Sequence, residues 1–172
     1  MFVHLNTHSV YSEMSGLIPV KKLIQLSKVN GMGSLALTDV NCLSGFINFV
    51  KYCNSMEVKP IAGANLIAKD EDIIVLVENQ IGYENLCRII SKLHDNANQK
   101  VSDMIISYPS GLFILAENYV VLKQLKPVIS NTHLFIELRP GGSELDAKKL
   151  SKKLQLEIIA TGNVYFHNMS DY

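Results

Sequence analysis

The chain has 172 residues, 48% hydrophobic and 19% charged, which is the size and composition of one globular domain with a proper core. Its 16 Lys and Arg residues balance 16 Asp and Glu residues, so the whole chain has no excess positive charge for gripping nucleic acid. Cys42, Cys53 and Cys87 form no Cys-x-x-Cys pair, which argues against a disulfide framework or zinc knuckle. The sequence has no long apolar run and no signal-peptide pattern, so we expect a cytoplasmic protein without a membrane segment.

Strand-like and helix-like segments alternate along the chain. The spacing of apolar residues predicts strands over 2–5, 34–39, 59–68, 72–78, 111–116, 133–138 and 157–161, and helices over 19–30, 43–56, 82–93, 119–125 and 145–154. The polar stretch 95–100 is an expected loop. Continuous apolar strands alternating with helices favour parallel strands joined by right-handed crossovers, although the short turn after 59–68 suggests that 72–78 is its neighbour. In such an α/β fold, open or barrel-shaped, chemistry sits at the carboxyl ends of the strands.

The opening stretch carries the first candidate site. In an extended segment, His4, Asn6 and His8 would point to the same face, which is how a strand end presents metal ligands. The stretch resembles the first motif of the polymerase and histidinol phosphatase (PHP) domain at the N-terminus of bacterial DNA polymerase III alpha subunits. That motif reads His-x-His-Thr-His-Ser, followed by Tyr-Ser and Asp-Gly. Here Asn6 replaces the second His, and Ser15 replaces the Asp.

Four later segments resemble further motifs of the same family. In 36–45, Val40 stands where the family has a metal-binding His, and in 59–65, Asn65 replaces a bridging carboxylate. In 72–86, Asp72 falls at a His position and could still bind a metal. In 160–165, Asn163 and Tyr165 replace an Asp and a His.

The resemblance implies a distorted seven-stranded (β/α) barrel with its site at the mouth. Hydrolysis of phosphoesters by metal ions needs several His and carboxylate ligands, and only His8 is a matched ligand, with Asp72 as a possible second. We therefore expect no catalytic residue and no metal in this domain, but a remnant polar pocket. The pocket would consist of His8, Asp72, Asn6, Ser15, Val40, Asn65, Asn163 and Tyr165.

The resemblance also implies a function. Residues 1–172 would be one PHP domain, the N-terminal fragment of a longer DNA-directed DNA polymerase that acts in bacterial DNA replication and holds its magnesium in the palm. The domain itself would have a structural and docking role. Its partners would be the rest of the alpha chain and the proofreading exonuclease subunit, with DNA bound only through the parent polymerase.

Two other functions remain open on the sequence. An active metal-dependent phosphoesterase or 3′–5′ exonuclease could use His8, Asp39 and Asp72, with His4 or His167 as a further ligand. A nucleic-acid-binding module could use the lysines within 148–153, although a basic cluster on a helix is more often its solvated face.

Overall fold

The computed structural model describes residues 2–12, 15–96 and 98–166. Within these ranges the chain forms a set of strands and helices that largely follows the expected order. The strands are β1 (Ser34–Leu37), β2 (Lys59–Ala68), β3 (Glu71–Val77), β4 (Leu112–Ala116), β5 (Leu134–Leu138) and β6 (Ile158–Ala160). The helices are α1 (Val20–Val29), α2 (Phe46–Ser55), α3 (Gln80–Asp95), α4 (Val101–Ser107), α5 (Tyr119–Leu125) and α6 (Glu144–Leu154).

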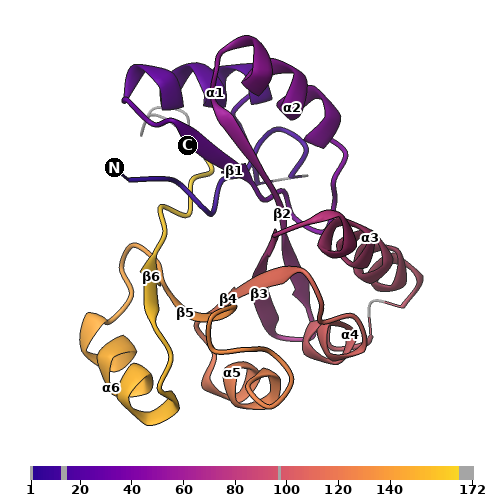
Figure 1. Cartoon of the computed structure of the whole chain (residues 1–172), viewed down its shortest axis with the longest axis vertical. Helices are drawn as coiled ribbons and strands as arrows, with labels where there is room; N and C mark the ends of the chain where they lie inside the picture. Colours follow the sequence, from indigo (N-terminus) through magenta and orange to yellow (C-terminus); the bar gives the residue numbers. More distant parts are fainter. Residues whose placement is uncertain (1, 13–14, 97, 167–172) are drawn as a thin grey trace.

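The strands form one six-stranded sheet in the order β1-β2-β3-β4-β5-β6. Figure 1 shows this sheet curling through the centre like half a barrel, with the helices outside it. The expectation of parallel strands is wrong for β3, which runs antiparallel to both β2 and β4. The chain turns from β2 into β3 through Lys69 and Asp70, with φ of 46° and 63°. Such a two-residue turn suits a hairpin, whereas a parallel connection needs a dozen or more residues.

The N-terminal segment joins the two edges of the curled sheet. On one side, the backbone N–H groups of Ala36 and Thr38 donate to the carbonyls of His4 and Thr7. On the other side, His8 N–H donates to the carbonyl of Val164 at 2.8 Å, and Val164 N–H donates to the carbonyl of Asn6 at 3.0 Å. Figure 1 accordingly places the first and the last described residues on the side of the molecule where β1 lies.

The prediction of a strand over 2–5 is wrong, because these residues belong to no strand and the N-terminal segment pairs only just after them, in an isolated bridge from Thr7 to Val164. The N–H of Thr7 donates to the side-chain hydroxyl of Thr38 at 2.9 Å. A side chain therefore takes the place of a backbone carbonyl, and a regular ladder cannot continue there.

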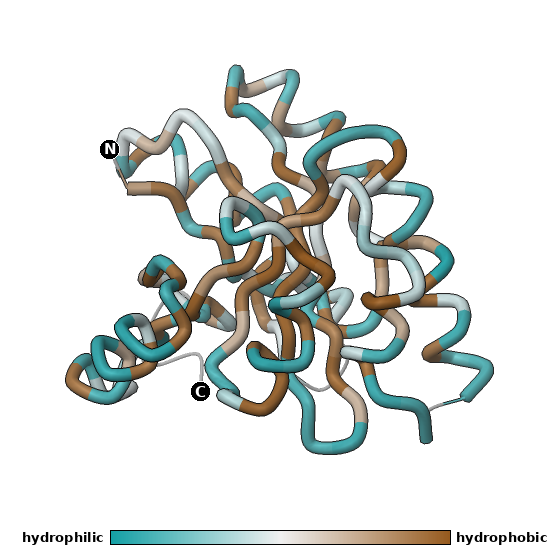
Figure 2. Tube along the Cα trace, turned by 60° about the horizontal axis from the view of Figure 1, so that its bottom comes forward, coloured by the Kyte–Doolittle hydropathy of each residue, from teal (hydrophilic) through white to brown (hydrophobic). Residues whose placement is uncertain are grey.

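The two faces of the sheet bury different side chains, since successive residues of a strand point to opposite sides. The outer face packs against α3 to α6 and carries residues such as Ile73, Val75, Ile114 and Ile136. A smaller apolar cluster on the inner face includes Ile74 and Leu115. Figure 2 shows hydrophobic chain concentrated in the middle of the molecule and hydrophilic chain along the outer turns.

Local signals explain most helix ends. Asn79 and Asn118 cap α3 and α5 by accepting hydrogen bonds from backbone N–H groups of the first turn. The chain leaves α1 through Gly31, whose φ of 70° suits a glycine. Helix α4 is not expected from the sequence, and it begins where the Glu71 carboxylate accepts from the backbone N–H of Ser102 at 2.8 Å. No helix in the described ranges is long and apolar enough to cross a membrane.

Candidate functional site: a charged network at the mouth of the sheet

We call the open end of the curled sheet, where β1, β4, β5 and β6 finish, the mouth. Because β3 is reversed, its first residues lie at the same end: Ile73 pairs with Ala116 of β4, so Asp72 lies level with Glu117, just past the end of β4. In β5, Glu137 alternates with Ile136 of the outer cluster and therefore faces inward. Polar residues thus gather above the inner apolar cluster.

Arg139, which directly follows β5, binds the carboxylates of this mouth. Its two terminal nitrogens donate to the two oxygens of Asp72 at 2.6 and 2.9 Å, a bidentate pair. Its Nε donates to Oε2 of Glu137 at 2.8 Å and lies 3.8 Å from Glu117. Burial alone would lower the pKa of Arg139, but the hydrogen bonds to Asp72 and the charge of Glu137 outweigh it and raise that pKa. The guanidinium is therefore a permanent cation among three acidic residues.

The other oxygen of Glu137 binds residues of two further segments. Its Oε1 accepts from the Asn6 amide at 2.8 Å and from the Thr161 hydroxyl at 2.6 Å. The Glu137 side chain is fully buried, so these partners and Arg139 replace the water that a buried carboxylate would otherwise require. One side chain thereby joins the N-terminal segment, β5 and the chain after β6.

His8 continues the network through Asn6. The Asn6 amide nitrogen donates to Glu137, so its oxygen, 2.8 Å from His8 Nε2, must accept, and His8 carries its proton on Nε2. The other ring nitrogen, Nδ1, lies 3.3 Å from Ser12 Oγ. That hydroxyl donates its proton to Asp39 at 2.7 Å. The contact with Asn6 thus selects the tautomer of the neutral ring that is protonated on Nε2.

The environment of His8 keeps it uncharged. Burial lowers the pKa of His8 to about 4, with the charge of Asp72 raising it and that of Arg139 lowering it. The ring stacks on Tyr165, with the centroids 3.9 Å apart and the planes 2° from parallel. Burial also raises the pKa of Tyr165, so both rings are neutral near pH 7.

Asp39 holds the loop after the first motif in place by hydrogen bonds. Its carboxylate accepts from the backbone N–H of Ser9 at 2.6 Å, from the Ser9 hydroxyl at 2.8 Å and from Ser12. Asp39 is 1% exposed. Its oxygens are therefore committed to holding residues 9–12, as expected for an Asp that anchors a turn.

Two replaced positions lie side by side. Val40 and Asn65 form a backbone bridge, and the side chain of Asn65 is fully buried with no hydrogen-bond partner for either amide atom. The Oδ1 of Asn163, which follows β6, is also buried without a partner. Ser15, by contrast, is exposed, and its backbone N–H donates to the carbonyl of Ser12.

These donors do not suit a divalent metal ion. In the described ranges, no three His, Cys, Asp or Glu side chains are placed to hold one. The carboxylates of Asp72 and Glu137 are bound to a guanidinium, that of Asp39 accepts from Ser9 and Ser12, and the His8 nitrogen that faces Asn6 carries a proton. A metal needs deprotonated, uncommitted ligands, and the amide and apolar groups at 65 and 40 add none.

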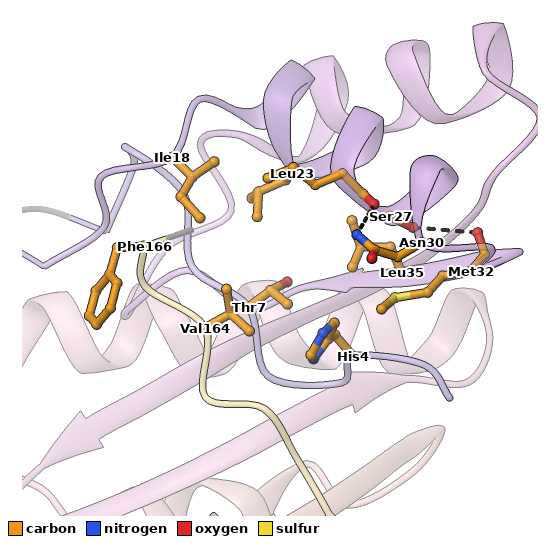
Figure 3. A pocket seen from close by; sticks show the side chains of 11 residues that line it. His4, Thr7, Ile18, Leu23, Ser27, Asn30, Met32, Leu35, Val164 and Phe166 are labelled. Carbon is orange, nitrogen blue, oxygen red and sulfur yellow. Dashed lines mark hydrogen bonds between the residues drawn. The ribbon is translucent and has the colours of Figure 1, made fainter. Parts of the chain in front are cut away.

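His4 lies apart from this network. It lines a cavity of about 310 Å³ between α1, β1 and the chain around Val164, which Figure 3 shows from close by. Burial lowers the pKa of His4, and its Nδ1 has no hydrogen-bond partner. Most of the lining is apolar, including Leu23 and Leu35. His167, the other ligand considered for an active enzyme, lies outside the described residues.

The lysines of α6 have partners of their own. Lys148 and Lys149 form ion pairs with Glu144 and Asp146, at 2.5 and 3.1 Å. The ammonium of Lys153 lies 4.1 Å from the centre of the Tyr119 ring. These contacts are those of a solvated amphipathic helix, and they leave less free positive charge for nucleic acid.

Glu117, Glu137 and Arg139 are the site residues that the sequence interpretation missed. The signal is present: Glu137 interrupts an otherwise apolar strand, and Arg139 follows two residues later on the same face. A buried acid needs a partner, so this spacing could have predicted the pair.

The sequence of the chain is similar to a known protein family and to several curated proteins. A family model described as "PHP domain" matches residues 4–166. DNA polymerase III subunit alpha of Haemophilus influenzae is 27% identical over 204 residues, covering 99% of this chain and 18% of that protein. The same subunit of Vibrio cholerae is 32% identical over 127 residues, covering 67% of this chain and 11% of that protein. This chain thus spans less than a fifth of these curated relatives.

Several solved structures share the fold, and one of them serves as an example. It is a two-domain protein of Bacteroides vulgatus described as containing a predicted PHP-like metal-dependent phosphoesterase, and it superimposes with a TM-score of 0.65 at 13% identity. The match covers 99% of this chain and 53% of that chain.

Proposed function

Because the chain belongs to the PHP domain family, we propose that residues 1–172 are the PHP domain of a bacterial DNA polymerase III alpha subunit. The parent chain would be a DNA-directed DNA polymerase that works in the cytoplasm, with magnesium bound in a different domain. The partner of this domain would be the rest of the same polymerase chain. The domain would encounter DNA only as part of that polymerase.

The proposed role of the domain itself is structural, without a catalytic metal. One observation carries this proposal: the guanidinium of Arg139 binds Asp72 and Glu137 at the mouth, where a metal-dependent relative would need free carboxylates. Of the remnant positions, Asn6 and His8 are then neutral groups joined by a hydrogen bond, and Tyr165 is a neutral ring stacked on His8. Such groups can hold strand ends together but cannot activate water.

The fold would be completed as a distorted seven-stranded barrel. Supporting this proposal, the segment around Thr7 makes backbone hydrogen bonds on both sides: its carbonyls accept from β1 and the residue after it, and it both donates to and accepts from Val164. It would serve as an irregular seventh strand that closes the half-barrel.

We also propose that the domain docks the proofreading exonuclease subunit, as the family resemblance suggests. Analytical size-exclusion chromatography of the purified chain mixed with the exonuclease subunit of the same bacterium would show co-elution. Separate elution at micromolar concentrations of both proteins would contradict the docking role.

The metal-free role is tested by elemental analysis of the purified chain. The same sample is assayed for hydrolysis of a phosphodiester and of single-stranded DNA, with and without added Mn²⁺ or Zn²⁺. We expect substoichiometric metal and no turnover. About two or three tightly bound ions per chain, with turnover that His8→Ala abolishes, would instead establish the active phosphoesterase or exonuclease.

A further inference from the structure

The carboxylates of the mouth pose an electrostatic problem. Asp72 belongs to β3 and Glu137 to β5, and the strand between them, β4, is followed directly by Glu117. Three acidic side chains from neighbouring strands would repel one another, most strongly around Glu137, which is fully buried. Stability of this end of the sheet therefore requires a cation.

Arg139 has the geometry to be that cation. Its guanidinium is planar and presents its donors in a fixed fork, so one edge can bind both oxygens of Asp72 while Nε binds Glu137. The Arg139 side chain is only 15% exposed, so solvent screens these contacts weakly. His8, which reaches Glu137 through Asn6, does not supply this charge, because burial keeps it neutral near pH 7.

We propose that the guanidinium of Arg139 is the built-in cation of the mouth, joining β3 to β5 through Asp72 and Glu137 in place of a metal ion. This inference rests on the proposed metal-free role of the domain. It assigns to Arg139 a positioning role: through Glu137 it also fixes Asn6 and Thr161, and with them the closure of the half-barrel.

The test is thermal unfolding of the 172-residue chain and its variants at neutral pH. Arg139→Gln leaves a buried carboxylate without its counter-ion, and we expect the melting temperature to fall by roughly 6–20 °C. Arg88 is the matched control, because it also pairs with an acid, Glu84, but both side chains are about half exposed. Arg88→Gln should change the melting temperature by less than about 2 °C.

A second variant separates charge from packing. In the combined variant Asp72→Asn/Glu137→Gln/Arg139→Gln, the carboxylates that Arg139 binds by hydrogen bonds are neutral, and only Glu117, which is half exposed, keeps its charge. We therefore expect at least half of the lost melting temperature to return. A residue that served only to fill space would show no such recovery. If Arg139→Gln does not fold at all, we still expect the combined variant to fold. A combined variant that is unfolded would overturn the inference.

The two proposals fail in different ways. A melting temperature of the wild-type chain that rises with added Mn²⁺, or stoichiometric bound metal, would refute the metal-free role. Equal effects of Arg139→Gln and Arg88→Gln in a metal-free chain would refute only the role of Arg139.

Discussion

His8 should make the stability of the chain sensitive to mild acid. In the folded protein burial lowers the pKa of His8 to about 4, against an ordinary value of 6.5. At a pH between these two pKa values, His8 is protonated in the unfolded chain but not in the folded chain. The free energy of unfolding therefore decreases as the pH falls from about 6.5 towards 4. With 1.36 kcal/mol for each pKa unit, the loss between pH 7 and pH 4.5 is roughly 2.5 kcal/mol.

Urea denaturation of the wild type and of His8→Gln at several pH values between 7 and 4.5 measures this effect. His8→Gln removes the titrating group. Its free energy of unfolding should therefore fall by roughly 2.5 kcal/mol less than that of the wild type between pH 7 and 4.5, which is about 1 M in the urea midpoint. His94→Gln, at an exposed position, is the control for the change from an imidazole to an amide side chain. A constant difference between wild type and His8→Gln across this pH range would refute the assignment of His8 as a buried neutral base.

Three substitutions test the packing of the fold by urea denaturation. In Gly82→Ala the new Cβ would lie 1.7 Å from the carbonyl oxygen of Gly111, so we expect a loss of roughly 1–3 kcal/mol despite the higher helix propensity of alanine; unchanged stability would show that the two backbones can separate. Glu71→Gln removes the charge that receives the N–H and hydroxyl of Ser102 at the start of α4, and it should cost about 1–2 kcal/mol; a neutral result would contradict this role. Asn65→Leu replaces a buried amide without partners, so we expect stability to be unchanged or higher by up to about 1 kcal/mol; a loss above that would reveal a hydrogen bond of Asn65.

The order of strands and helices could be predicted because long apolar segments with turn residues between them determine it. The direction of β3 could have been predicted too, since Lys69 and Asp70 leave no room for a crossover. Helix α4 could not, because its seven residues are too few for a clear period, and the Glu71 side chain at its start comes from a different strand. The strand prediction for the N-terminal segment is wrong because the pairing of this segment depends on Thr38 and Val164, which are far away in the sequence.

The site was predicted in part. The motif positions led to Asn6, His8 and Tyr165, which the structure brings into direct contact or joins by a hydrogen bond. Asp72 was considered as a metal ligand, whereas its oxygens bind Arg139. A motif comparison examines only the positions that a family marks as ligands, and so it overlooks a cation supplied by an unmarked position.

The closure of the half-barrel has a consequence for synthesis on the ribosome. Asn6 reaches its partner Glu137 across a sequence separation of 131 residues, and Thr7 pairs with Val164. Asn6 and Thr7 therefore leave the ribosome long before the residues that satisfy their polar groups, and contacts of such long range form slowly. Until then the apolar inner face and the edge of β1 stay open to other chains, so we expect a chaperone requirement to be greatest for nascent chains that end before Glu137.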